Sequence, residues 1–284
     1  MERRFGSLEQ LRTQSEQSWE EFEAEIHEKR FDTVIVSSED IPAAKQRDEL
    51  LERFKKSFDR ITGVFYFRDP VDLYVSEINQ RIRHGLRLRQ TPTPRDYKFR
   101  HLEFADWFTS SVGHNALIAR NFNRQNLVGG DAVEDFFGVM SKICGFTDEF
   151  DIPEVPVNQS LPGAATVWMY SFNEILDRRF RNVNKKILER RSEVVKQLRK
   201  SEAVMQHGKL KLDDPQLQSI IRQNADADIR QINEKYLAGQ VPLKTDSNPP
   251  VDLTTEQARE RMREWLLGYM TPDAVSSIAR ELLS

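Results

Sequence analysis

The sequence predicts an α/β fold in its first half and a helical extension in its second half. Two short runs rich in β-branched and aromatic residues, at 32–38 and 61–67, flank a segment with helical periodicity, the order expected of a βαβ unit. Both runs are continuous rather than alternating, which is typical of parallel strands covered on both faces. Only 12 of the 284 residues are glycine, which argues against a loop-rich all-β fold. We therefore expect a three-layer α/β body with a parallel sheet, followed by helices from about residue 164 onward.

Apolar residues recurring at intervals of three and four define the helices expected in the first half. These helices span about 8–30, 42–60, 70–84, 101–111 and 131–145. Asp69 precedes Pro70 and suits an N-cap, and Asp131 with Glu134 has the spacing of a capping box. Strands are expected near 32–37, 61–67 and 116–119.

Three prolines between residues 147 and 163 predict a largely irregular segment. We place the domain boundary there, with an α/β domain over 1–163 and a helical C-terminal extension over 164–284. Within the extension, glycine and proline at 208–215 and 239–250 predict breaks between helices.

Composition excludes several classes of protein. The net charge of -3 and a pI near 6.1 argue against a globally basic nucleic-acid binder. The single cysteine excludes an intramolecular disulfide and a four-cysteine zinc site, and the five histidines form no metal-ligand pattern, so no metal is expected. No apolar run approaches the roughly 20 residues that span a bilayer, and no apolar stretch follows the charged start. We expect a soluble cytoplasmic protein.

The most informative stretch follows the second expected strand. Arg68 comes directly after that strand, and Asp69-Pro70 then opens a helix. Ligands of parallel sheets lie beyond the carboxyl ends of the strands, and a helix N-terminus favours an anion. Arg68 suits a phosphate because its guanidinium can donate two parallel hydrogen bonds, and Ser76, two helical turns on, offers a hydroxyl. The alternative is an arginine paired with a surface carboxylate and a serine facing solvent.

Arg68-Asp69-Pro70, with Ser76 eight positions after the arginine, resembles the 3′-phosphate-binding motif of sulfotransferases that use 3′-phosphoadenosine 5′-phosphosulfate (PAPS). Residues 34–40 and 120–136 also resemble bacterial members of that family, and 158–161 do so more faintly; the resemblance covers about 31–175. It implies a P-loop-NTPase-like sheet, PAPS as co-substrate, and Arg68 and Ser76 as ligands of the adenosine 3′-phosphate.

The chain departs from the family in one respect. Sulfotransferases carry a loop rich in Gly, Lys and Thr after their first strand, which holds the 5′-phosphosulfate. No G-x-x-x-x-G-K-[ST] motif occurs in this sequence, and the residues before Phe31 are expected to be helical. The resemblance therefore implies an N-terminally truncated form of the fold, and we expect the chain as given to be a weak or inactive enzyme.

Two further residues are candidates for the site. Glu39 follows the first expected strand and is the candidate base for removing a hydroxyl proton, although an N-cap role for residues 38–40 is an alternative. Arg120 follows the third expected strand; by resemblance it faces the cofactor cleft, and an ion pair is the alternative.

The function expected from these residues is transfer of a sulfuryl group from PAPS to a carbohydrate hydroxyl. Basic residues over 81–100 are suited to an anionic polysaccharide acceptor or to a solvated surface. Two alternatives remain, a non-catalytic remnant that binds a nucleotide such as adenosine 3′,5′-bisphosphate, and a helical interaction protein. The second alternative rests on residues 178–211, with twelve Lys or Arg against three Glu.

Overall fold

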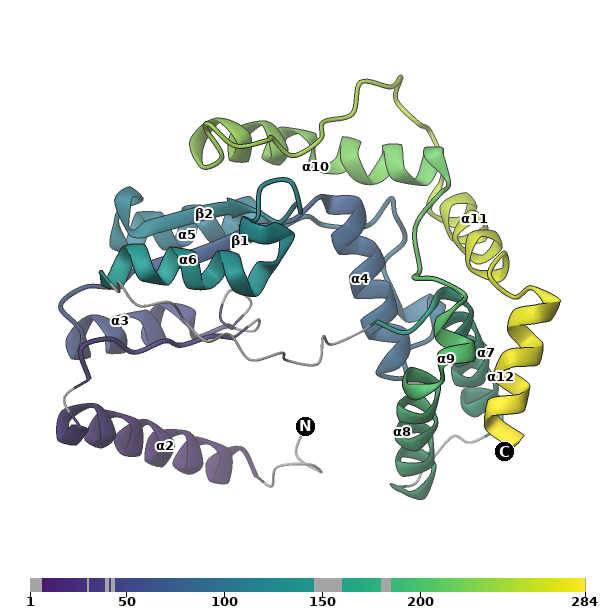
Figure 1. Cartoon of the computed structure of the whole chain (residues 1–284), viewed down its shortest axis with the longest axis horizontal. Helices are drawn as coiled ribbons and strands as arrows, with labels where there is room; N and C mark the ends of the chain where they lie inside the picture. Colours follow the sequence, from purple (N-terminus) through teal and green to yellow (C-terminus); the bar gives the residue numbers. More distant parts are fainter. Residues whose placement is uncertain are drawn as a thin grey trace.

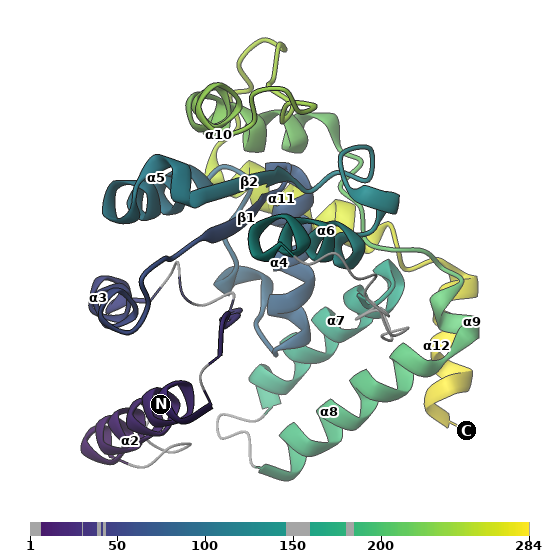
Figure 2. The same ribbon diagram turned by 60° about the vertical axis from the view of Figure 1, so that its left-hand side comes forward.

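The structure is a computed structural model that describes residues 7–29, 31–38, 41, 44–145, 160–179 and 185–283. Most of these residues are helical, and the strands of the described part form one small sheet (Figure 1). Both views place α2 (Leu8–Lys29) and α3 (Arg47–Ser57) at one end of the molecule and α8 (Lys185–Lys200) and α12 (Pro272–Leu283) at the other (Figure 2). The mostly helical α/β character agrees with the sequence prediction.

The sheet consists of two parallel strands, β1 (Gly63–Phe67) and β2 (Leu117–Asn121). Their register pairs Gly63 with Leu117 and Phe67 with Asn121. A glycine is needed at position 63 because a Cβ there would lie 2.7 Å from the ring of Phe108. The predicted strands at 61–67 and 116–119 are confirmed, and so is their parallel direction.

Helices lie against both faces of this sheet. Successive side chains of β1 point to opposite faces, so each face contacts a different set of helices. Phe65 and Phe67 face His101 of α5 (His101–Val112), and Phe67 also stacks on Tyr236 at the end of α10 (Pro215–Lys235). Tyr66 points the other way and bonds Asp135 of α6 (Ala132–Cys144).

The prediction of a strand at 32–37 is wrong. Residues 31–38 form no strand, and Ile35 and Val36 are 56% and 48% exposed. A β-branched run becomes a strand only when a neighbouring strand accepts its backbone hydrogen bonds. No such bond joins residues 32–37 to another described residue. The described sheet therefore has two strands, and a three-layer P-loop-like sheet is not shown.

The N-terminal helices contact each other, and α3 also contacts α5, where the indole nitrogen of Trp107 donates to Asp48. The ring of Trp19 in α2 lies 5.5 Å from that of Phe54 in α3, and Arg53 bonds Glu16 at 2.8 Å. Both predicted helices are confirmed, although α3 begins at Arg47 rather than Pro42.

The helix that follows β1, α4 (Pro70–Arg83), lies at the centre of the helical part of the molecule. It contacts α10 and α7 (Gly163–Arg179). The chain continues through α9 (Glu202–Met205), α11 (Thr255–Leu267) and α12. Short 3-10 turns occur at Leu88–Gln90, His114–Ala116 and Val128–Gly130. The predicted helical second half is confirmed.

One hydrophobic core joins the two halves of the sequence. It runs from Phe67 through Tyr74 and Ile78 of α4 to Ile229 of α10 and Ile278 of α12, all of them 0–1% exposed. A buried side-chain amide also joins the two halves: Nδ2 of Asn79 donates a hydrogen bond to the carbonyl of Leu161 at 3.1 Å. Most of the predicted boundary segment, residues 146–159, lies outside the described residues.

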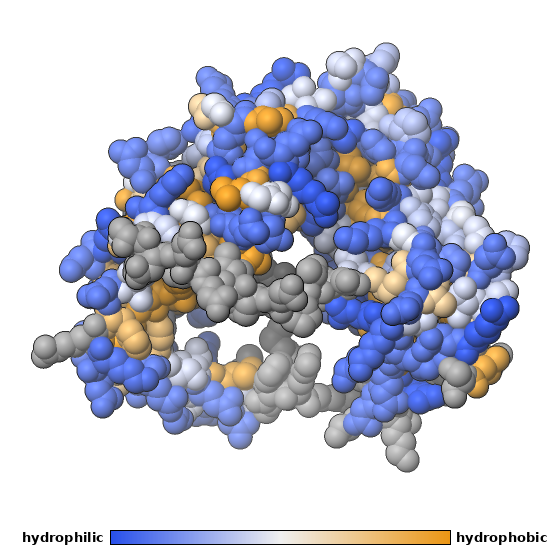
Figure 3. Space-filling view, viewed as in Figure 1, coloured by the Kyte–Doolittle hydropathy of each residue, from blue (hydrophilic) through white to orange (hydrophobic). Residues whose placement is uncertain are grey.

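The face seen in Figure 3 is mostly hydrophilic, with apolar residues in separate small areas. No described helix combines the length and the apolar character needed to cross a membrane.

Candidate functional site

Arg68 lies at the carboxyl end of β1, as the sequence predicts. The strand ends at the fully buried Phe67, and the Arg68 side chain is half-buried. Its guanidinium carbon lies 5.6 Å from the ring centre of Phe122, which follows β2. Among the described residues it makes no hydrogen bond or ion pair, so the predicted alternative of a surface carboxylate partner is not observed. A half-buried cation without a counter-charge favours an anion.

The start of α4 places two more charges at this edge. Asp69 caps the helix by accepting a 2.9 Å hydrogen bond from the amide of Val71, as predicted. Its other oxygen lies 3.6 Å from Nη2 of Arg222, a residue of α10. Nε of Arg222 is buried without a hydrogen-bond partner in the described structure. Two guanidinium groups and the Asp69 carboxylate therefore lie at this edge, and the carboxylate of Asp246 is close enough to interact with the charge of Arg222.

Ser76 lies six residues after Pro70, about 9 Å further along the axis of α4. It is half-buried, and its hydroxyl has no recorded partner in the described part of the chain. Helical serines commonly bond the carbonyl four residues earlier, so an unused hydroxyl is open to a ligand or water.

His101 is a member of this site that the sequence did not reveal. Its ring lies among Phe65, Phe67 and Phe99, with centroid distances of 5.4, 6.0 and 4.8 Å. Nδ1 is buried with no partner among the described residues. Burial and, secondarily, the charge of Arg68 lower the pKa of His101 to about 4, so the ring is neutral at pH 7. Arg68 therefore lies close enough for its charge to act on the His101 ring. The sequence alone assigns His101 no role, because the five histidines form no metal-ligand pattern.

Arg120 is bound within the protein. Its Nε donates to Oδ2 of Asp135 at 2.9 Å, Nη2 bonds the other oxygen, and Nη2 also donates to the carbonyl of Asn126 at 2.8 Å. The Asp135 side chain is fully buried and accepts further bonds from Tyr66 at 2.9 Å and from the amide of Val128 at 3.1 Å. Burial acts to raise the pKa of Asp135, but these hydrogen bonds outweigh it and lower the pKa. The ion-pair alternative is therefore the one that the structure shows for Arg120.

Glu39, the predicted base, lies outside the described residues.

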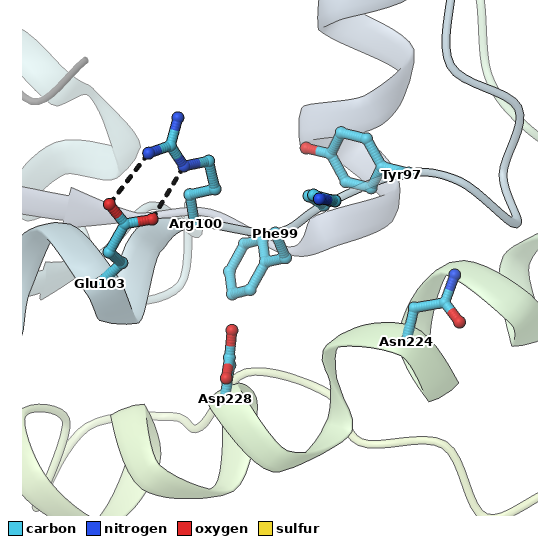
Figure 4. A pocket seen from close by; sticks show the side chains of 7 residues that line it. Tyr97, Phe99, Arg100, Glu103, Asn224 and Asp228 are labelled. Atoms are coloured by element: carbon cyan, nitrogen blue, oxygen red, sulfur yellow. Dashed lines mark hydrogen bonds and ion pairs between the residues drawn. The ribbon is translucent and has the colours of Figure 1, made fainter. Parts of the chain in front are cut away.

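A groove of about 540 Å³ lies between the segment before α5 and one face of α10 (Figure 4). Its lining residues are Tyr97, Lys98, Phe99, Arg100, Glu103, Asn224 and Asp228. The groove adjoins His101, because Phe99 packs on the ring of that residue. Burial is the main cause that raises the pKa of Tyr97, which keeps its hydroxyl protonated.

The two basic segments identified in the sequence do not form free cationic surfaces over their whole length. In the 81–100 loop, Arg81 pairs with Glu77 and Arg100 with Glu103. Arg95 bonds the carbonyl of Leu253 at 2.6 Å. In the 178–211 segment, α8 directs Arg191 inward, where it is 8% exposed. Charge counts along the sequence therefore overstate the available positive charge.

Within the described ranges no group of three or more His, Cys, Asp and Glu side chains could hold a metal ion. Comparison of the chain with protein-family models, curated proteins and solved structures finds no match.

Proposed function

We propose that Arg68, together with Ser76 and Arg222, binds the 3′-phosphate of an adenosine nucleotide, and that the chain is related to PAPS-dependent sulfotransferases. The observation that carries the proposal is the half-buried Arg68, which has no counter-charge in the described structure. It lies at the carboxyl end of a parallel strand, where α/β proteins bind ligands. The buried, unpartnered Nε of Arg222 supports an anion at the same edge.

The reaction proposed is sulfuryl transfer to a carbohydrate hydroxyl. The hydroxyl oxygen bonds to the sulfur of PAPS, the bond from sulfur to the phosphate oxygen breaks, and adenosine 3′,5′-bisphosphate leaves. Glu39 is the proposed acceptor of the hydroxyl proton, by its place in the sequence. Arg120 is left out of the proposed nucleotide contacts because Asp135 already binds it.

Adenosine 3′,5′-bisphosphate tests the nucleotide site directly. At 100 times its Kd it should stabilise the protein by about 2.7 kcal/mol, which a thermal melt detects. Arg68→Ala should abolish this shift, and Arg190→Ala, a change at an exposed arginine of α8, should leave it intact. A second readout is the pKa of His101 by NMR titration. A bound phosphate opposes the charge of Arg68, so the pKa of His101 should rise on binding. Equal responses of the wild type and Arg68→Ala would show that Arg68 is not the phosphate ligand.

A second candidate function is nucleotide binding without turnover. It is favoured by the absence of a G-x-x-x-x-G-K-[ST] motif from this sequence, since that loop supplies donors to the phosphosulfate. Transfer of radiolabelled sulfate from PAPS to bacterial polysaccharides distinguishes the two. Under the enzymatic proposal, Glu39→Gln lowers the rate by about 10²–10⁴-fold with little change in nucleotide affinity. Tight binding of the bisphosphate with no transfer would favour the non-catalytic function.

A further inference from the structure

The groove beside α10 has features that the nucleotide site does not use. Asp228 points from α10 toward the ring of Phe99, and Asn224, one helical turn earlier on α10, also lines the groove (Figure 4). Tyr97 and Phe99 are only 5% and 7% exposed, so they form a largely buried aromatic wall opposite α10. All these α10 residues lie outside the part of the chain that resembles sulfotransferases.

The polar groups of the groove are partly unused. Asp228 is half-buried, with no hydrogen bond or ion pair recorded among the described residues. Its pKa is raised by burial and then by the nearby charge of Asp106. Lys98 also has no recorded partner in the described part of the chain. The amide nitrogen of Asn224 donates to the carbonyls of Pro94 and Arg95 at 3.1 and 2.9 Å, which leaves its oxygen as an acceptor.

The charges of the groove sum to zero. Arg100 and Glu103 neutralise each other through two hydrogen bonds of 2.8 and 2.9 Å. Lys98 and Asp228 contribute one charge of each sign. Asp228 would repel an acidic ligand and Lys98 would repel a basic one, so the lining favours an uncharged ligand. Because the free groups include both donors and acceptors, they suit hydroxyl groups, which donate and accept at once.

We propose that this groove binds an uncharged saccharide, whose hydroxyls donate to Asp228 and to the Asn224 oxygen and accept from Lys98. A volume of about 540 Å³ lies within the range of small-molecule sites, and the open groove allows a saccharide chain to continue beyond it. Asp228 supplies the charge-assisted hydrogen bond, which is the strongest of these interactions. A further role rests on the proposed function: the bound saccharide would be the sulfuryl acceptor. It would then be neutral, unlike the anionic polysaccharide suited to the basic residues at 81–100.

Binding without any nucleotide tests the proposal separately from the proposed function. The probes are maltohexaose, cellohexaose and chitohexaose, with a heparin hexasaccharide as the acidic comparison, each titrated to 10 mM and followed by calorimetry and ligand-observed NMR. At least one neutral probe should bind, and more tightly than the heparin probe. Asp228→Ala should weaken that binding by about tenfold or more. The matched control is Asp226→Ala on the same helix, because the Asp226 carboxylate already pairs with Arg230. The affinity of this variant for the saccharide should equal that of the wild type.

Alanine favours helix, so both variants should keep the circular dichroism spectrum of the wild type. Absence of binding by all three neutral probes would overturn the proposal. Equal affinities of the wild type and Asp228→Ala, or preference for the heparin hexasaccharide, would also overturn it. Since no nucleotide is present, a failure here leaves the adenosine 3′,5′-bisphosphate test unaffected, and the reverse holds as well.

Discussion

Replacing His101 by phenylalanine should remove part of the acid sensitivity of this protein. His101 lies among three phenylalanine rings with its Nδ1 unsatisfied in the described structure, so a phenylalanine fits the apolar surroundings. Burial lowers the pKa of His101 to about 4, whereas an unfolded chain has the ordinary value of 6.5. The unfolded state therefore binds a proton more readily, and the wild type loses stability as pH falls from about 6.5 to about 4.

The magnitude follows from the separation of the two pKa values. At pH 7.5 the imidazole is neutral in both states and contributes no pH dependence. At pH 5 the unfolded histidine is almost fully protonated and the folded one is not, which costs the wild type about 2 kcal/mol relative to pH 7.5. The loss approaches about 3 kcal/mol below pH 4. A constant difference in packing between histidine and phenylalanine does not alter these changes.

Urea unfolding of the wild type and His101→Phe at several pH values between 7.5 and 4.5 measures the effect. Between pH 7.5 and pH 5, the free energy of unfolding of the wild type should fall by about 2 kcal/mol more than that of His101→Phe. Arg68→Ala should raise the pKa of His101 and shrink the acid-induced loss, because the charge of Arg68 helps to keep the ring neutral. Parallel pH profiles for the wild type and His101→Phe would refute the reasoning.

Two further predictions concern buried charges, those of Asp135 and Arg191. Asp135→Ala removes a fully buried carboxylate that holds Arg120, Tyr66 and an amide, and it should cost about 3 kcal/mol in urea unfolding, against about 1.5 kcal/mol for Tyr66→Phe; equal losses would contradict the central role of the carboxylate. Arg191→Ala should cost about 3 kcal/mol, because the guanidinium donates to the Ile82 carbonyl at 2.6 Å and to Asn173 at 3.0 Å. Burial lowers the pKa of Arg191 to about 10, which shows that the charged form is disfavoured there. Arg191→Met removes the buried charge and keeps the packing, so it should lose less stability than Arg191→Ala. A loss below about 1 kcal/mol for Arg191→Ala would contradict this account.

Local patterns were sufficient for most elements. The helices and the strands at 61–67 and 116–119 were predictable because periodicity, capping residues and prolines act within a few positions of the chain. The placement of Arg68 at a strand end and of Asp69 as an N-cap followed from the same local rules. The run at 32–37 was mispredicted because strand formation needs a hydrogen-bonding neighbour, and its residues alone do not show whether one is present.

The sequence by itself determined which residues form helices, where β1 ends, and that an arginine begins the segment after it. Only the tertiary structure decided which charges remain available. Asp135 lies fifteen positions from Arg120 and binds it, while Arg68 meets no carboxylate among the described residues. The charge of Arg68 acts on His101, and Arg222 pairs with the neighbouring Asp69. The groove likewise combines residues near 97–103 with α10, more than 120 positions later. Burial and pairing depend on contacts between distant segments, and these determine whether a charged side chain stabilises the fold or is free to bind a ligand.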